Sequence, residues 1–133
     1  MRTDLTDKIQ EIAKDIYRTL GSGFSEDVYD KAMQVGFRIA HIHYEAQRVL
    51  ALSYKNHCIG EAYPDLVVGT GDDRIVVELK AINGELGAPE EQQLRNYMKI
   101  LGIRWGLLIN FPQPGKSKRN KTKIQPDVRV ITL

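Results

Sequence analysis

Residues 64–80 read Pro64-Asp65-Leu66-Val67-Val68-Gly69-Thr70-Gly71-Asp72-Asp73-Arg74-Ile75-Val76-Val77-Glu78-Leu79-Lys80. Two apolar runs, 66–68 and 75–77, flank a connection rich in Gly and Asp, which predicts two neighbouring β-strands joined by a turn. Side chains alternate along a strand, so Glu78 and Lys80 share one face and their apolar neighbours share the other. Charged groups are rarely buried in a strand without a partner or a metal ion. This stretch is therefore the main candidate for a functional site.

The composition is that of an ordinary globular protein. The chain has 133 residues, 42% hydrophobic and 27% charged, which fits a single domain over residues 1–133. A formal net charge of +2 permits an anionic partner without requiring one. The single cysteine, Cys58, excludes an intrachain disulfide and a cluster held by four thiolates. No apolar run approaches the ~20 residues of a membrane span and no signal-peptide pattern opens the chain, so we expect a cytoplasmic protein without membrane contact.

Apolar residues recur at helical spacing in three segments. The first helix is expected over 5–20, the second from near Ser25 to Ile39, and the third over 89–101. Ser25 is a suitable N-cap, and Glu26 follows in the first turn, where the helix dipole favours anions.

Strand patterns fill much of the remaining chain. We expect strands over 49–54, 58–68, 74–80, 105–110 and 128–133. Pro64 interrupts the second of these, so a bulge or an edge position is expected there, which would re-aim the Asp65 carboxylate. The third helix would connect two strands as a crossover, which predicts a parallel pair. The order of elements predicts an α/β fold in which a mixed β-sheet is flanked by α-helices.

Asp65 and Glu78 are expected to bring two carboxylates together on neighbouring strands. Like charges at close range repel, and a divalent cation removes that conflict. Hard oxygen ligands suit Mg²⁺, which takes one or two carboxylates together with waters and a substrate phosphate. Lys80, on the same face, would steady an attacking water or the charge that develops on the phosphate. The alternative interpretation of the same three residues is a surface salt-bridge ladder.

Three further side chains favour the catalytic interpretation. Glu26 lies at a helix start, where it could supply a third carboxylate. Gln93 and Tyr97 lie one turn apart on the helix that follows the lysine strand, and so face the same way.

Other residues fit less well. His41, His43 and His57 lack a second ligand cluster at zinc spacing. Cys58 is expected to be a core residue of a strand. Trp105 and Tyr29 are also expected in the core, as aromatic side chains more often pack there than serve as stacking platforms.

A loop at about 112–126 carries a basic run. It is expected to be either a solvated loop or an arm that contacts phosphates. Its basic residues are Lys116, Lys118, Arg119, Lys121 and Lys123.

Pro64-Asp65 followed by Glu78-Leu79-Lys80 resembles the signature of the PD-(D/E)XK nuclease superfamily. The segment 93–97 resembles the Gln-x-x-x-Tyr element of RecB-like members. The segment 23–29, Gly-Phe-Ser-Glu-Asp-Val-Tyr, is similar to the signature of the GxxExxY protein family, and 107–111 is similar to that family's strand after the crossover helix. The resemblance covers roughly residues 5–112.

The resemblance implies a restriction-endonuclease-like fold and a nuclease that uses Mg²⁺ or Mn²⁺ to hydrolyse phosphodiester bonds of nucleic acid, with DNA as the expected substrate. It implies that Asp65 and Glu78 hold the metal ion, with Glu26 as an auxiliary acid acting through a water or the metal. It implies that Lys80 is the catalytic lysine and that Gln93 and Tyr97 support the site or contact the nucleic-acid backbone.

Two alternatives stay open from the sequence. One is a structure-selective endonuclease similar to the archaeal Holliday-junction resolvases, which would require a homodimer. The other is a non-catalytic module that retains the fold and binds nucleic acid or protein.

Overall fold

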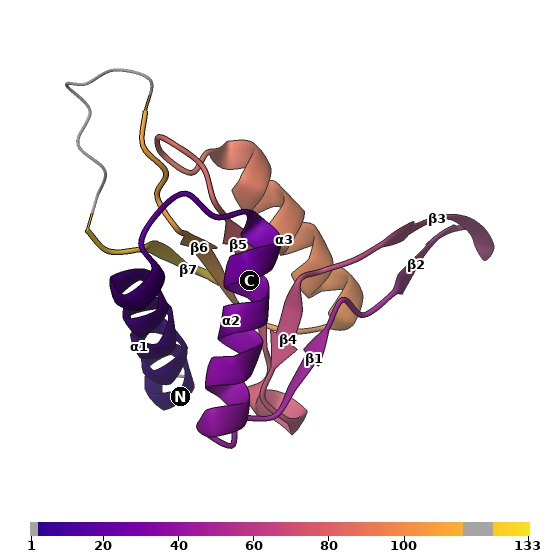
Figure 1. Cartoon of the computed structure of the whole chain (residues 1–133). Helices are drawn as coiled ribbons and strands as arrows, with labels where there is room; N and C mark the ends of the chain where they lie inside the picture. The colour runs from indigo at the N-terminus through magenta and orange to yellow at the C-terminus, as the bar shows by residue number, and fades with distance from the viewer. Residues whose placement is uncertain (1–2, 116–123) are drawn as a thin grey trace.

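The computed structural model describes residues 3–115 and 124–133. Three helices, α1 (Thr3–Leu20), α2 (Glu26–Ile39) and α3 (Ala88–Leu101), surround the strands, so the predicted α/β class is confirmed (Figure 1). The strands are β1 (Tyr44–Ala46), β2 (Leu50–Tyr54), β3 (His57–Ala62), β4 (Leu66–Val68), β5 (Ile75–Lys80), β6 (Trp105–Asn110) and β7 (Asp127–Thr132). No helix within the described ranges is long and apolar enough to cross a membrane.

The main sheet has five strands in the order β1-β4-β5-β6-β7. Strands β5 and β6 are parallel, whereas the other neighbouring pairs are antiparallel. The parallel pair spans the crossover helix α3, as the sequence predicted. Strand β6 is apolar along its length and buried between β5 and β7, because both of its faces are covered.

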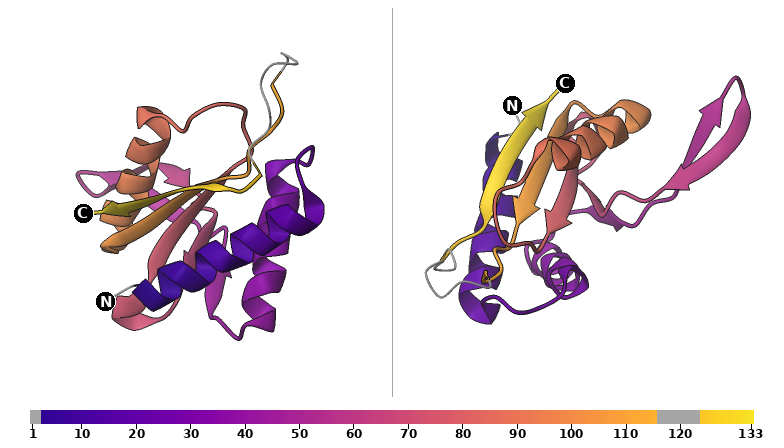
Figure 2. Two further views of the ribbon diagram at one scale, coloured as in Figure 1. Left: turned by 90° about the vertical axis from the view of Figure 1, so that its left-hand side faces the viewer. Right: turned by 90° about the horizontal axis from the view of Figure 1, so that it is seen from above.

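Two hydrophobic cores lie on the two faces of the sheet. Helices α1 and α2 cover the face that carries Ile75, Val77 and Leu79, and α3 covers the face that carries Val76 (Figure 2). The predicted alternation along β5 is confirmed, because neighbouring residues belong to different cores. Glu78 therefore belongs to the α3 face of the sheet.

The expectation of one long strand over 58–68 was wrong. The chain leaves β3 after Ala62 and starts β4 only at Leu66, and Pro64 lies buried in the break. Proline has no N–H for a ladder hydrogen bond, so it ends the pairing there instead of forming the expected bulge. Strand β4 lies inside the sheet between β1 and β5, so the expected edge position is wrong as well.

Strands β2 and β3 form a separate two-stranded hairpin that reaches out from the body (Figures 1 and 2). Lys55 and Asn56 form its turn with φ values of 47° and 67°, as in the primed turns that suit the strand twist. The expectation that Cys58 is a core residue was wrong: it is exposed on β3, because the hairpin has no second layer to bury it. Strand β1, which pairs with β4, was not predicted because three residues are too few to show a pattern.

Candidate active site

Asp65 and Glu78 face each other across strands β4 and β5. These strands pair antiparallel with Leu66 opposite Val77, so Asp65, one residue before β4, lies opposite Glu78. Residues directly opposite each other in an antiparallel pair share a face, with Cβ atoms about 4.5–5.5 Å apart. Asp65 therefore lies just before the first residue of β4, after the break at Pro64, and is still aligned with Glu78.

Each carboxylate accepts one hydrogen bond from the backbone of the neighbouring segment. The backbone N–H of Asp65 donates to Oε1 of Glu78 at 2.8 Å, and the N–H of Leu79 donates to Oδ2 of Asp65 at 2.8 Å. One oxygen of each carboxylate is therefore fixed by a main-chain donor. The second oxygen of each carboxylate can interact with the other carboxylate, with a proton or with a cation.

Burial makes this pair electrostatically costly. The Glu78 side chain is only 4% exposed, and burial followed by the charge of Asp65 raises the pKa of Glu78 to about 8. Burial also raises the pKa of Asp65, although the Leu79 N–H, the Lys80 charge and a hydrogen bond with Glu78 oppose the rise. Without a cation, the two groups therefore hold a proton at neutral pH.

Lys80 ends β5 on the same face as Glu78 and is partly buried. Its charge lowers the pKa values of Asp65 and Glu78, so its ammonium group lies in their field. Within the described residues, however, it forms no ion pair with either carboxylate. A salt-bridge ladder therefore describes Asp65, Glu78 and Lys80 poorly. The Lys80 ammonium group is instead available to bind a group from outside the protein.

Asn110, opposite Lys80 on β6, fixes the chain beyond the lysine. Its side chain is fully buried, accepts the N–H of Ile82 at 2.9 Å and donates to the Ile82 carbonyl at 3.2 Å. The N–H of Phe111 also donates to the Lys80 carbonyl at 2.8 Å. The sequence analysis missed Asn110, although a polar residue ending an apolar strand was the signal that could have identified it.

Helix α2 brings two more acids to the site from the other face. Glu26 begins the helix, and its pKa is raised by desolvation and then by Asp65. Asp30, one turn later and only 3% exposed, raises the pKa values of both Glu26 and Asp65. Its Oδ1 accepts a hydrogen bond of 2.7 Å from Gln34. Asp30 was also missed, although its spacing of four residues from Glu26 places both on one helix face.

Tyr29 holds the start of α2 against the end of β6. Its ring is fully buried and stacks on Phe111 with centroids 4.4 Å apart, so its expected core position is confirmed. Its hydroxyl donates to the Gly21 carbonyl at 2.7 Å and accepts from Gln113 at 3.2 Å. The N–H of Gly23 donates to the same Gln113 side chain at 2.8 Å. These contacts place the α2 N-terminus beside the ends of the central strands.

Gln93 and Tyr97 approach from α3. Burial and then the charges of Glu78 and Asp65 raise the pKa of Tyr97, while a hydrogen bond with Gln93 lowers it. The phenol therefore lies in the field of the carboxylate pair, and Gln93 is its neighbour one turn away. Hydrogen bonds join Asp65 and Glu78, and charge effects place Glu26, Lys80 and Tyr97 near this pair, with Gln93 one helical turn from Tyr97.

The donor set fits a hard cation through two carboxylates. Within the described ranges, no group of three or more His, Cys, Asp or Glu side chains is arranged to hold a metal ion. Mg²⁺ commonly uses only one or two carboxylates and takes its other ligands from water and substrate phosphate, so Asp65 and Glu78 meet its needs. With two carboxylates as ligands, Glu26 would take an outer position.

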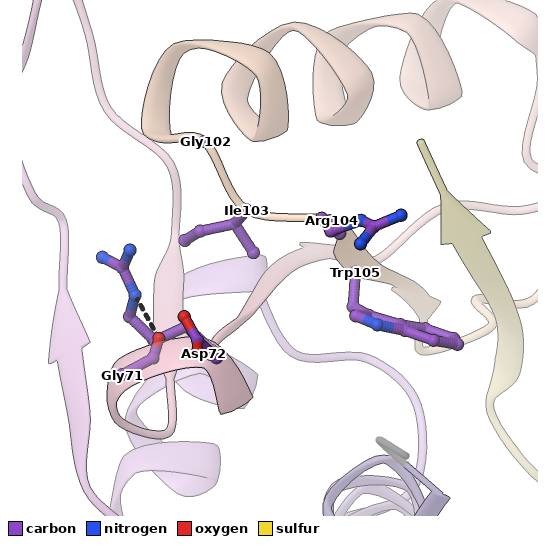
Figure 3. Close-up of a pocket in the computed structure, with 7 residues that line it drawn as sticks. Gly71, Asp72, Gly102, Ile103, Arg104 and Trp105 are labelled. Carbon is purple, nitrogen blue, oxygen red and sulfur yellow. Dashed lines mark hydrogen bonds between the residues drawn. The ribbon is translucent and has the colours of Figure 1, made fainter.

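A hollow lies at the end of β5 and β6 that is farther from the carboxylate pair. Its lining includes Gly71, Asp72, Ile103, Arg104 and Trp105. Figure 3 shows that the Arg104 side chain points away from Asp72, so these two opposite charges do not face each other across the hollow. In open α/β sheets, ligands bind beyond the carboxyl ends of the strands, and this hollow lies at the amino ends of β5 and β6. The basic run 116–123 lies outside the described residues.

A mixed sheet with paired carboxylates followed by a lysine is the arrangement expected of the nuclease class that the sequence resembles. A family model described as the PD-(D/E)XK nuclease superfamily matches residues 3–124. The chain therefore belongs to the PD-(D/E)XK nuclease superfamily, whose members are typically metal-dependent and bind nucleic acid. No curated protein and no solved structure matches the chain.

Proposed function

We propose that this protein is a metal-dependent nuclease that hydrolyses phosphodiester bonds, with Mg²⁺ or Mn²⁺ as cofactor and DNA as substrate. The observation that carries the proposal is the carboxylate pair of Asp65 and Glu78, in which Glu78 is buried and Asp65 is partly buried. A backbone N–H of the neighbouring segment fixes each carboxylate, yet among the described residues no cationic side chain forms an ion pair with either of them. A carboxylate pair of this kind is costly to the fold, which suggests that it is retained for a cation.

Each residue then has a distinct role. Asp65 and Glu78 would hold the cation, which when bound would polarise the scissile phosphate and acidify a water. Lys80 would donate hydrogen bonds to that water or to the phosphate oxygens, where negative charge develops. Glu26 would act from the α2 N-terminus through a water. Gln93 and Tyr97 would position the substrate backbone from α3.

We further infer that the chain belongs to the GxxExxY branch of the superfamily. The two segments that resemble this branch, 23–29 and 107–111, are far apart in the sequence but contact each other through the stack of Tyr29 on Phe111. Gln113, two residues past the second segment, joins them by hydrogen bonds to Gly23 and Tyr29. Tyr29, the tyrosine of this signature, thus has a structural role. Glu26, the glutamate of the signature, would act at the candidate site.

Two other functions stay predictions from the sequence. A resolvase-like enzyme would require a homodimer, which light scattering would detect as twice the 15.1 kDa mass of the chain. A non-catalytic binding module would retain the fold without needing the cation.

Four alanine variants test the proposal by calorimetric Mn²⁺ titration with cleavage assays on single-stranded, duplex and branched nucleic acids. Asp65→Ala and Glu78→Ala should lose metal binding and cleavage together, because each removes a ligand. Lys80→Ala should retain or strengthen metal binding, because a nearby positive charge is removed, but lower cleavage by about 10²–10³, as for loss of one preorganised donor. Glu26→Ala should retain metal binding and cleave more weakly than the wild type.

Lys14→Ala, on helix α1 where the side chain pairs with Glu11, is the matched control and should behave as the wild type. If the wild-type protein binds no divalent ion at millimolar concentration, even with nucleic acid present, the nuclease proposal is wrong and the binding module takes its place.

A further inference from the structure

The β2–β3 hairpin and helix α3 enclose a groove beside the candidate active site. The groove has a volume of about 650 Å³, within the range of ligand sites. Leu52 and Ala62 of the hairpin form one wall, and Gln93 and Tyr97 of α3 lie in the other. Tyr97 also lies within reach of the charges of Glu78 and Asp65, so this wall of the groove lies beside the carboxylate pair.

The walls of this groove carry little charge. Among its lining residues there is no carboxylate, and Lys99 is the one charged side chain. Gln92 and Asn96 present amides, joined by a hydrogen bond of 2.9 Å, and Ile100 is 47% exposed beside them. Apolar and amide groups suit the faces and edges of planar bases, which a single strand can present and a duplex keeps stacked and paired inside.

The hairpin continues this surface beyond the groove. Tyr54 lies two residues after Leu52 on β2, so the two side chains share a strand face. Its ring is 61% exposed, and the Lys55 ammonium lies 5.3 Å from the ring centroid. An exposed aromatic ring with an adjacent cation is the pairing that single-strand binding surfaces use for stacking bases and attracting phosphates.

We propose that this groove holds unpaired nucleotides next to the phosphate to be cleaved, which makes single-stranded nucleic acid the substrate class. The inference rests on the proposed function in that it takes the carboxylate pair as the cleavage site. A paired duplex would keep its bases inside and would leave the Leu52 and Ile100 side chains without a partner. A single strand can turn its bases onto them while its backbone passes Tyr97.

Binding measured without cleavage tests this inference. Fluorescence anisotropy in EDTA would compare a labelled oligothymidine, its RNA counterpart and a matched duplex. We expect the single strands to bind more tightly than the duplex. Leu52→Glu should weaken single-strand binding about tenfold or more, because it places a carboxylate in the path of the strand.

The matched control is Ile59→Glu, which adds the same charge to the same hairpin at a residue that is 69% exposed and lies outside the groove. It should leave the affinity within about twofold of the wild type. Ile100→Glu probes the opposite wall, so a hairpin that fails to fold in the Leu52 variant does not remove the test. Thermal unfolding of each variant identifies such a failure.

The possible outcomes separate this inference from the nuclease proposal. Equal affinity for duplex and single strand, unchanged by both groove variants, overturns the groove inference even if Mn²⁺-dependent cleavage is found. A change in mass by light scattering in the Leu52 variant, with unchanged affinity, also overturns it and makes the groove a protein interface. Groove-dependent binding in a protein that cleaves nothing supports the inference and overturns the nuclease proposal.

Discussion

At the scale of single residues, Glu78 carries the main electrostatic conflict of the site. Its carboxylate is buried against that of Asp65, and the hydrogen bond from the Asp65 N–H only partly compensates. A proton relieves the conflict in the metal-free protein, and a cation would relieve it in the loaded protein. The fold is therefore expected to gain stability when the charge at this position is removed.

Glu78→Gln should stabilise the metal-free protein at pH 7–8. The pKa of Glu78 is about 8 in the folded protein against 4.5 for the free group, so the folded state binds more protons between these values and its stability falls as pH rises. Glutamine retains the oxygen that accepts the Asp65 N–H and has no charge to bury. In EDTA, urea unfolding should show a gain over the wild type that grows from pH 5 to pH 8, to on the order of 2 kcal/mol.

Glu11→Gln serves as the control for this prediction, because Glu11 lies exposed on α1 and, among the described residues, its ion pair is with the partly exposed Lys14 at 3.5 Å. Its difference from the wild type should stay small at all pH values. A Glu78→Gln variant that is less stable than the wild type at pH 8 would show that the carboxylate is a structural partner.

At the scale of the elements, the close approach of α1 and α2 determines where the helix carrying Glu26 and Asp30 lies. The two helices meet at Gly36, where an added Cβ would lie 2.4 Å from Cγ2 of Ile12. That distance is far inside van der Waals contact, and isoleucine is stiff at χ1, so the side chain cannot rotate away cheaply. The absence of a side chain at Gly36 thus determines how closely α2 approaches α1.

Gly36→Ala should destabilise the fold by about 1–3 kcal/mol, because overpacking outweighs the gain of about 1 kcal/mol in helix propensity. In an Ile12→Ala background, where Cγ2 is gone, the same change should instead be neutral or stabilising. Urea denaturation of the four proteins gives the coupling between the two positions. Additive effects would show that the helices do not pack at this point.

At the scale of the whole molecule, charge is nearly balanced except in one segment. Residues 116–123 hold five basic side chains and no acid, whereas the candidate site is itself acidic. A nucleic acid that reaches the carboxylates must be attracted by cations elsewhere on the molecule. The basic run is the segment of the sequence best suited to do so.

Replacing Lys116, Lys118, Arg119, Lys121 and Lys123 by alanine should flatten the salt dependence of duplex DNA binding. Each phosphate contact contributes a slope of about −0.9 in log affinity against log salt, because neutralised phosphates release counterions. Anisotropy titrations over a range of NaCl concentrations would measure the slope. As a control, a variant changes five basic residues of α1 and α2 instead: Lys8, Lys14, Arg18, Lys31 and Arg38. Equal slopes in the two variants would identify the basic run as a solvated loop.

Local sequence patterns predicted the helices, most strands and the meeting of Asp65 with Glu78. These features follow from local rules: apolar periodicity marks each element, and a short connection between two strands makes them antiparallel neighbours. Glu78 and Lys80 then share a face because side chains alternate. The chemistry of a carboxylate pair beside a lysine could therefore be predicted from seventeen residues, 64–80.

Three features result from packing between distant segments: the break at Pro64, the outward position of the hairpin, and the positions of Asp30 and Asn110 near the site. These features depend on contacts between segments far apart in the chain, whose formation depends on how whole layers pack. The pattern over 58–68 suits one strand. In the structure, however, β1 pairs with one edge of β4, and β3 pairs with β2 alone in a separate sheet. The groove between that hairpin and α3 exists because of this division, so no local pattern could have indicated it.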